Sequence, residues 1–414
     1  MNKIFLSVPL EKDLGKEIFD RLEGELIESI IREAKVECNE NEWKMMLEGH
    51  SYKVSEELTP EIYKICHEVK LLLNFEEPLD FYITNSSDFN AFAIPKSDDD
   101  QNHLINLNST LVERLTNEEL KFVIGHEIGH LISDSIRIKK LIRFVFPESN
   151  RIPMSLENKI RLWDQLSELT ADRYGFLACP NLKTFMEGFF KMSSGLDIQR
   201  LNIQLDALLE DNDKHIEYFK SGKGVNISSH PINPIRIKAI QLFSESSLFK
   251  NASASIEQPG PDAGLEDKIM DLIKILLIVS SSELDKHRQY FIASAGLIVS
   301  SQDEKIEKEE IDETLAILSN FTIFPDDFLE SISKSGSVNE IFAQSINNII
   351  SANPGERVPM MEYLIRISLS NKDISQKEID FLFHAGNDLL GLTRKEVAQI
   401  LAGQIKVHFM PELF

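Results

Sequence analysis

The chain has 414 residues, of which 42% are hydrophobic, and a formal net charge of −23 at pH 7. This length is too great for one ordinary hydrophobic core, so two or three domains are expected. The strong negative charge argues against nucleic acids and anionic membrane surfaces as partners.

The cysteines and the apolar segments indicate a globular protein without disulfides. Only Cys38, Cys66 and Cys179 occur, with no C-x-x-C pair, which predicts buried thiols rather than a disulfide framework or a cysteine zinc site. The apolar run at residues 4–10 is short for a signal peptide. No segment approaches the roughly 18 uncharged apolar residues of a membrane helix. We therefore expect a soluble, cytoplasmic protein with no membrane insertion.

The first part of the chain predicts helices followed by a small sheet. Apolar residues recur at helical spacing in residues 11–75, so a helical lead-in is expected over residues 1–75. Segments rich in β-branched and aromatic residues then predict three short strands, at Leu79–Thr84, Ala91–Ile94 and Leu104–Leu107. The aspartates at residues 98–100 are read as a solvated turn in preference to a cation site.

A helix is expected where residues 120–133 read LKFVIGHEIGHLIS. Thr116 and Glu119 have the spacing of a capping box, which marks the start of that helix. Gly125 and Gly129 lie inside it, where each costs about 1 kcal/mol relative to alanine. This cost predicts a closely packed neighbour, such as a strand or a bound peptide.

The same helix carries the pattern H-E-x-x-H at His126, Glu127 and His130. Residues four apart lie on one face of a helix, so the two histidines can bind one metal ion together. Glu127 then lies beside the open coordination position as a general base. The pattern is a signature of zinc hydrolases, and its alternative is a chance match on a buried amphipathic helix.

A third metal ligand is expected from a later helix, predicted from Ser155 to Cys179. A catalytic zinc usually takes three protein ligands and a water, and H-E-x-x-H supplies two. Glu168 fits the third position. Asp172, one turn later, can accept a hydrogen bond from the distal nitrogen of a ligand histidine. Asp164 shares the face and competes as a ligand by spacing alone, and a solvated acidic face is the alternative for all three.

Between these helices, residues 136–147 read IRIKKLIRFVFP, a basic and aromatic stretch. A short run of this kind in an acidic chain predicts a helix with snorkelling lysines, in preference to a nucleic-acid or membrane site. The small sheet just ahead of the histidine helix is a layout in which an edge strand can pair with an extended peptide.

The motifs together resemble the HtpX-like and CAAX-prenyl-endopeptidase family of gluzincin zinc metallopeptidases, over about residues 60 to 245. The motifs that carry this resemblance occur in the family's order and are NAFAI (90–94), HEIGH (126–130), ELTAD (168–172) and SSHPINPIRI (228–237). The chain lacks the transmembrane helices of the better-known members, so it resembles the soluble branch.

The resemblance implies a role for each residue of these motifs. It makes His126, His130 and Glu168 the zinc ligands, Glu127 the base and Asp172 the hydrogen-bonding partner of a ligand. It assigns the pairing with the substrate backbone to Asn90, Ala91, Phe92 and Ala93. It brings His230 and Arg236 to the zinc, where they bind substrate, stabilise the oxyanion or occlude the metal. For these last two, the alternative is a turn before a helix with a surface arginine.

The last third of the chain is predicted to be a separate helical domain. Residues 251–265 are small, polar and rich in Pro and Gly, which indicates a linker between a metallopeptidase domain at 1–250 and a domain at 266–414. Segments 301–312 and 369–380 align without gaps, so this domain is expected to be a pseudo-symmetric helical bundle.

Both copies of that repeat resemble the TerB-like (tellurite-resistance) helical domain, which implies a regulatory or substrate-recruiting module. The carboxylates of this repeat that could bind a cation are Asp303 and Glu310 in the first copy and Asp373 and Glu378 in the second. The glycine expected in such loops is missing, so helix N-capping is preferred over a cation site.

We therefore expect an α+β, mostly helical protein: a zincin-type metallopeptidase domain with a small sheet, followed by an all-α pseudo-repeated helical bundle. The expected activity is a Zn²⁺-dependent endopeptidase acting on cytosolic polypeptides, with a zinc-polarised carbonyl and with Glu127 taking the proton of the attacking water. The helical domain would control or target it and could bind a protein partner. The alternative is a non-catalytic, zinc-containing binding or stress-response protein acting through the TerB-like module.

Overall fold

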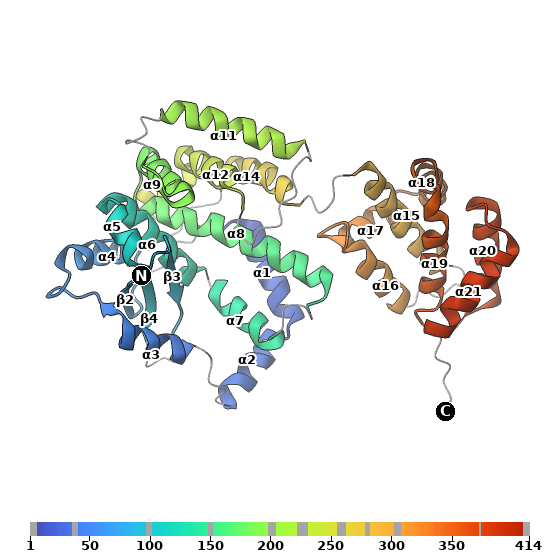
Figure 1. Cartoon of the computed structure of the whole chain (residues 1–414), viewed down its shortest axis with the longest axis horizontal. Coiled ribbons are helices and arrows are strands. Elements are labelled where there is room, and N and C mark those ends of the chain that lie inside the picture. The colour runs from blue at the N-terminus through green and yellow to red at the C-terminus, as the bar shows by residue number, and fades with distance from the viewer. Residues whose placement is uncertain are drawn as a thin grey trace. The chain divides into compact units, whose positions relative to one another are not determined.

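The computed structural model describes residues 6–34, 40–96, 102–133, 135–147, 152–197, 204–221, 231–254, 262–277, 282–301, 308–371 and 374–408. The chain divides into two compact units (Figure 1). The first comprises Met1–Ile152 and Ile160–Leu276, and the second comprises Pro153–Lys159 and Leu277–Phe414. The protein is mostly helical, with one small mixed sheet in the first unit.

The helices of the first unit are α1 (Pro9–Arg21), α2 (Gly24–Glu33), α3 (Glu40–His50), α4 (Pro60–Leu72), α5 (Ser109–Arg114), α6 (Asn117–Ile132), α7 (Ser135–Val145), most of α8 (Met154–Ala178), α9 (Leu182–Ser194), α11 (Leu205–Lys220), α12 (Asn233–Glu245), α13 (Ser247–Ser253) and α14 (Ala263–Leu276). The helix predicted at Ser155–Cys179 is α8, and the basic stretch forms α7. The division between the units falls after α14, later than the expected linker, because α14 packs on α12.

The sheet has four strands in the order β1-β2-β4-β3, namely β1 (Tyr52–Lys53), β2 (Leu79–Thr84), β4 (His103–Asn108) and β3 (Ala91–Ile94). The three predicted strands all form, β4 with one extra residue at each end. β2 and β4 are parallel, with Phe81 opposite Ile105, and β3 is antiparallel to β4, with Phe92 opposite Asn106. β1 was not predicted because two residues are too few to show alternation. Among the described residues β3 pairs only with β4, so it is an edge strand.

The helical lead-in packs directly on the sheet. A small apolar core joins α3 to the strands and consists of Leu47, Tyr82, Ile94 and Leu104. Phe92 packs against this core, and the Trp43 ring of α3 meets the Phe92 ring edge-on, with 5.5 Å between centroids. This contact places the indole of Trp43 next to the edge strand.

The start of α6 is fixed by the predicted capping box. The Glu119 backbone N–H donates to the Thr116 hydroxyl (3.3 Å), and the Thr116 backbone N–H donates to the Glu119 carboxylate (2.7 Å). Lys191 of α9 forms an ion pair with the same carboxylate (2.9 Å). Satisfying two orphan N–H groups and neutralising the buried carboxylate stabilises this end of the helix.

The beginning of the chain is anchored to α8. The backbone N–H groups of Leu6 and Val8 donate to the Tyr174 hydroxyl (3.1 Å) and the Thr170 hydroxyl (3.0 Å). The Thr170 hydroxyl also donates to the carboxylate of Glu11 on α1. Since α8 also carries Glu168, this anchor holds residues 6–11 against the helix that supports the candidate site.

Glu11 makes the stability of this anchor depend on pH. The side chain is 3% exposed, and burial raises its pKa to about 7, against the lowering effect of Thr170 and Arg173. A carboxyl with a raised native pKa binds more protons when folded, so its stabilisation is complete below the unfolded pKa of 4.5 and is lost as pH rises to about 7. Relative to the parent, Glu11→Gln should gain about 3 kcal/mol of unfolding free energy between pH 5 and pH 8.

Urea unfolding of the parent and the variant across that pH range measures this difference. Glu17→Gln on the same helix is the control, because Glu17 is partly exposed and pairs with Arg21 at 2.9 Å. A Glu11→Gln difference that stays constant with pH would contradict the assignment.

The second unit is entirely helical among its described residues. Its elements are α15 (Glu283–Val299), α16 (Lys308–Leu318), α17 (Pro325–Lys334), α18 (Val338–Ala352), η2 (Pro354–Glu356), α19 (Arg357–Ser368), α20 (Gln376–His384), η3 (Ala385–Leu389) and α21 (Arg394–His408). Their inward faces share one apolar core, which includes Phe291, Phe342 and Leu364.

Only part of the predicted repeat can be compared with the structure. Asp303 and Asp373 lie outside the described residues, as do the aspartates at 98–100 of the first unit. Glu378 forms a capping box with Ser375, accepting from its backbone N–H at 2.6 Å. This is the N-capping use that was preferred for that carboxylate. No described helix of either unit has both the length and the apolar character needed to cross a membrane.

Candidate metal centre

Glycines allow α6 and α8 to approach closely. A Cβ on Gly125 would lie 2.6 Å from the Cβ of Ala178, and one on Gly129 would lie 2.9 Å from the Cβ of Tyr174. A Cβ on Gly175 of α8 would lie 2.8 Å from the backbone oxygen of Phe122. The closely packed neighbour predicted from the α6 glycines is therefore another helix, and the expectation of a strand or a bound peptide was wrong.

Gly129→Ala is expected to destabilise the first unit by about 1–3 kcal/mol, because the added methyl overpacks the crossing of α6 and α8. Alanine's better helix propensity, about 1 kcal/mol, offsets only part of this cost. Gly49→Ala is the matched control, since no atom lies within 4 Å of its Cβ position on α3. Thermal unfolding should show a lower midpoint for the first variant and an equal or higher one for the second; a higher midpoint for Gly129→Ala would contradict this account.

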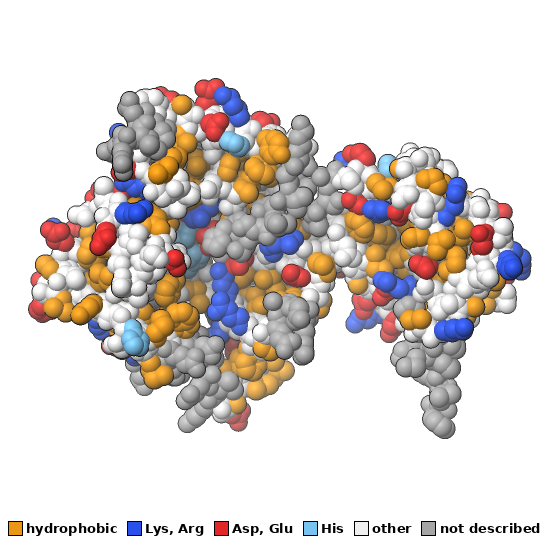
Figure 2. Space-filling view, viewed as in Figure 1, with side chains coloured by type: hydrophobic (Ala, Val, Ile, Leu, Met, Phe, Trp, Pro, Cys, Tyr) orange, Lys and Arg blue, Asp and Glu red, His pale blue; other side chains and the backbone are white. Residues whose placement is uncertain are grey.

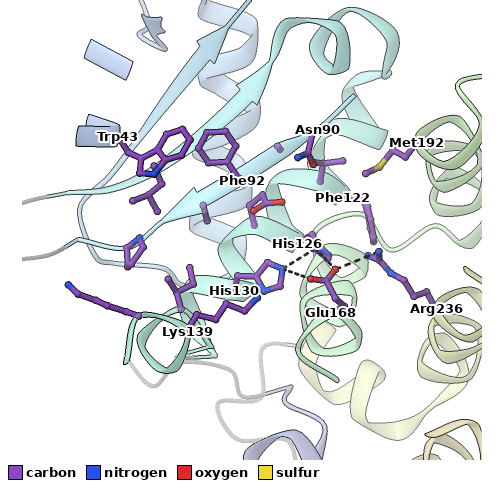
Figure 3. A pocket seen from close by; sticks show the side chains of 18 of the residues that line it. Trp43, Asn90, Phe92, Phe122, His126, His130, Lys139, Glu168, Met192 and Arg236 are labelled. Carbon is purple, nitrogen blue, oxygen red and sulfur yellow. Dashed lines mark hydrogen bonds and ion pairs between the residues drawn. The ribbon is translucent and has the colours of Figure 1, made fainter. Parts of the chain in front are cut away.

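The close crossing brings three metal-binding side chains together (Figure 3). The Nε2 atoms of His126 and His130 lie 3.2 Å apart. The Glu168 carboxylate lies 3.6 Å from the first of these nitrogens and 3.4 Å from the second. Ligands about 2.0–2.2 Å from a tetrahedral zinc are separated by about 3.3 Å, so these distances fit one ion.

The chemistry of the donors also fits zinc. Two imidazole nitrogens and one carboxylate, with a fourth position for water, form a common catalytic zinc set. His126 Nδ1 lies 3.0 Å from a carboxylate oxygen of Asp172. Because that oxygen can only accept, Nδ1 carries the proton and Nε2 presents its lone pair to the ion.

Arg236 of α12 completes this arrangement. Its guanidinium donates to both oxygens of Asp172, at 2.8 and 2.6 Å, and lies 3.6 Å from the Glu168 carboxylate. The Phe189 ring supports the guanidinium at 5.0 Å. Of the two residues that the resemblance brings to the zinc from the segment 228–237, the structure places Arg236 at the site, whereas His230 lies outside the described residues.

The local charges keep both carboxylates ionised. Burial alone would raise the pKa of Asp172, but the charge and hydrogen bonds of Arg236, with the hydrogen bond to His126, hold it below its usual value. Burial likewise opposes ionisation of Glu168, yet the hydrogen bond from His130 and the charge of Arg236 hold its pKa well below the ordinary range. Glu168 is therefore an anionic side chain that can bind a cation.

The centre opens into a cavity of about 730 Å³ lined by His126, Glu127, His130 and Glu168. Residues 90–95, which include β3, line the same cavity. Figure 3 shows Trp43 and Phe92 at one end and Met192 and Phe122 at the other, with the histidines and Glu168 between them. The expected strand residues Asn90, Ala91, Phe92 and Ala93 thus face the candidate centre together with Glu127.

The structure places Glu168, and not Asp164, with the two histidines, and it adds side chains to the cavity that were not predicted. Asp164, the competing ligand, forms an ion pair with Lys139 at 2.7 Å and is not part of the metal-binding group. Trp43 and the basic helix α7 line the cavity, although neither was predicted to do so. Arg143 follows Lys140 by three residues and Lys139 by four, a spacing that could have indicated one shared helix face.

Comparison with known proteins finds sequence similarity to metallopeptidases. Residues 56–147 match the model of peptidase family M48. That span includes β2, β3, β4 and the H-E-x-x-H of α6, and it ends before Glu168. It lies entirely within the first unit.

Individual relatives agree with the M48 match. The plastoglobule-localized metallopeptidase 48 of Arabidopsis thaliana is 28% identical over 223 residues, which are 50% of this chain and 64% of the relative. An HtpX protease homolog of Pediococcus pentosaceus is 36% identical over 93 residues, 22% of this chain and 30% of the relative. One from Helicobacter pylori is 40% identical over 109 residues, 24% and 34% of the two chains.

The chain therefore spans less than two thirds of the length of these relatives. No solved structure matches it. Similarity to M48 metallopeptidases, which use a metal ion, typically zinc, is supported by the family match, and the His126–His130–Glu168 group offers such an ion its ligands.

Proposed function

We propose that the first unit is a zinc-dependent endopeptidase that hydrolyses peptide bonds of polypeptide substrates. The observation that carries this proposal is the convergence of His126, His130 and Glu168 with Glu127 in one cavity beside an edge strand. A purely structural zinc site has no use for a base beside the ion or for an open cavity. The M48 match supports the same reaction class.

Each of these cavity residues has a separate role in hydrolysis. When bound, zinc supplies a Lewis acid that polarises the scissile carbonyl and lowers the pKa of a water to about 7. Glu127 accepts the proton of the attacking water and passes it to the leaving amine. Asp172 holds His126 in the tautomer that presents Nε2, and Arg236 keeps that carboxylate ionised.

The substrate backbone pairs with β3 in this proposal. Among the described residues the outer edge of β3 is unpaired, so its outward-pointing N–H and C=O groups lie along the cavity wall, whereas those of Asn90 already bond to Asp88 and Asn108. Adding an extended peptide to a sheet edge gives affinity through main-chain hydrogen bonds and aligns one peptide bond with the centre. We also propose that His230 and Arg236 contact the substrate.

The second unit is proposed to regulate or target the peptidase through a protein partner, as its TerB-like resemblance implies. Its pseudo-symmetry, the soluble-branch assignment and the cytoplasmic location also remain predictions. In the alternative, a non-catalytic protein would bind zinc in the first unit and act through the second.

Casein cleavage followed by mass spectrometry tests the proposal. We expect fragments with new internal termini, no cleavage after chelation, and recovery when zinc is returned. Zinc binding by a properly folded full-length chain without any cleavage of unfolded substrates would favour the non-catalytic alternative.

A further inference from the structure

One face of α7 forms a wall of the catalytic cavity. The residues of that face recur every three to four positions and are Ile136, Lys139, Lys140, Arg143 and Phe144. This spacing is the one that aligns side chains on a single helix face. The cavity wall next to the candidate centre is therefore mainly cationic over this helix.

Ion pairs of α7 with α2 and α8 fix which face it presents to the cavity. Arg137 forms a two-pronged ion pair with Glu28 of α2, with both N–O distances at 2.6 Å, and its guanidinium stacks on the Phe19 ring at 4.7 Å. Lys139 pairs with Asp164 of α8 at 2.7 Å. Two-pronged pairs restrain orientation more than single contacts do. Rotating the cationic face away from the cavity would break these interactions.

The charge of this wall is opposite to that of the protein. Among the described residues, the other charged side chains lining the cavity besides the two α7 lysines and Arg143 are Arg236, Glu127 and Glu168, and Arg236 is bound by Asp172. The whole chain carries a charge of −23. Figure 2 shows Lys and Arg side chains gathered near the middle of the first unit's visible face. A cationic wall on one side of a cavity attracts anionic groups of a ligand to that side.

The other end of the cavity has a different character. Phe122, Phe189 and Met192 line it, and in Figure 3 Lys139 lies on the opposite side of the histidines from Met192. An extended peptide lying along β3 would therefore place side chains from one side of the scissile bond near apolar residues and those from the other side near α7.

We propose that α7 makes the peptidase selective for polypeptides carrying an aspartate or glutamate side chain on the α7 side of the scissile bond. Lys140 and Arg143 are the specificity-determining residues, whereas the charge of Lys139 is balanced by its ion pair with Asp164. This inference deepens the proposed function and rests on it, because selectivity in cleavage requires that the protein is a peptidase. The electrostatic preference itself depends only on the cavity.

Peptide binding to the zinc-loaded, full-length Glu127→Gln variant tests the preference without cleavage. Pairs of C-terminally amidated peptides that differ by Glu or Gln at one position are compared by fluorescence anisotropy. We expect the Glu peptide to bind about three- to tenfold more tightly at one or more adjacent positions, since each partly exposed ion pair contributes modestly. The difference should shrink between about 0.05 M and about 0.5 M salt because exposed charges are screened.

Charge reversal at the wall provides the second arm. Lys140→Glu with Arg143→Glu should abolish or invert the preference. The matched control combines Lys183→Glu and Lys214→Glu, two exposed lysines on α9 and α11 outside the cavity lining, and should leave the preference intact. Circular dichroism and zinc content verify that each double variant is folded.

Equal affinity for Glu and Gln peptides at every position, or a preference unchanged by reversal of the α7 charges, would overturn the inference. Peptides with free C-terminal carboxylates separate side-chain recognition from terminal capture: a preference seen only with the free terminus would also overturn it. Failure of the proposed function would be seen as an absence of peptide cleavage. That result is distinct, because a protein that never cleaves peptides can still show, or lack, the Glu preference in binding.

Discussion

Glu127→Gln should abolish peptide hydrolysis while the protein keeps its fold and its zinc. Glutamine has nearly the shape of glutamate but cannot accept the proton of the attacking water at neutral pH, and general-base catalysis of this kind contributes about 10²–10⁴-fold. Glu127 lies in the cavity and is not part of the His126–His130–Glu168 ligand group. The measurement is the initial rate of casein cleavage at equal zinc content.

Glu118→Gln is the matched control for this substitution. Glu118 lies on the same helix, is exposed, and pairs with Lys121 at 2.9 Å, so its replacement should leave the rate unchanged. Cleavage by Glu127→Gln at the parental rate would show that Glu127 is not the general base.

Glu168→Gln should weaken zinc binding by more than about 100-fold, since loss of an outer hydrogen-bonding partner alone costs about 10–100-fold. The amide leaves the geometry of α8 in place but removes the negative charge that lies 3.4–3.6 Å from both histidine nitrogens. Competition with a chromophoric chelator measures the affinity, and cleavage should fall with zinc occupancy.

Asp164→Asn distinguishes Glu168 from the ligand that spacing alone would equally allow. Asp164 lies one turn earlier on α8 and pairs with Lys139, so its amide variant should bind zinc as the parent does. Weak zinc binding by Asp164→Asn together with parental affinity in Glu168→Gln would exchange the two roles.

Much of the centre could be predicted because its chemistry depends on local spacing. The four-residue interval between His126 and His130 and the capping box at Thr116 act within one helix, where sequence distance fixes spatial distance. The four-residue interval between Glu168 and Asp172 has the same basis on α8. What the spacing could not decide was the choice between Glu168 and Asp164, because it depends on which turn of α8 faces the two histidines of α6.

Long-range packing was the part that the sequence left open. The interior glycines of α6 indicated a close neighbour but not that it would be α8, since a missing Cβ fits a helix or a strand equally well. The basic residues of α7 were interpreted as snorkelling lysines on a helix, whereas Lys140 and Arg143 line the cavity once Arg137 fixes the orientation of the helix. The short strand β1 pairs through backbone bonds that carry no side-chain signature.

The most direct test of the account is a titration of the metal-free, full-length protein with zinc while casein cleavage is measured. The account predicts that the rate rises with added zinc, saturates at one equivalent per chain, and stays near zero in Glu127→Gln although that variant binds the same amount. Cleavage without metal, or one bound zinc in the parent with no cleavage of any unfolded substrate, would contradict it.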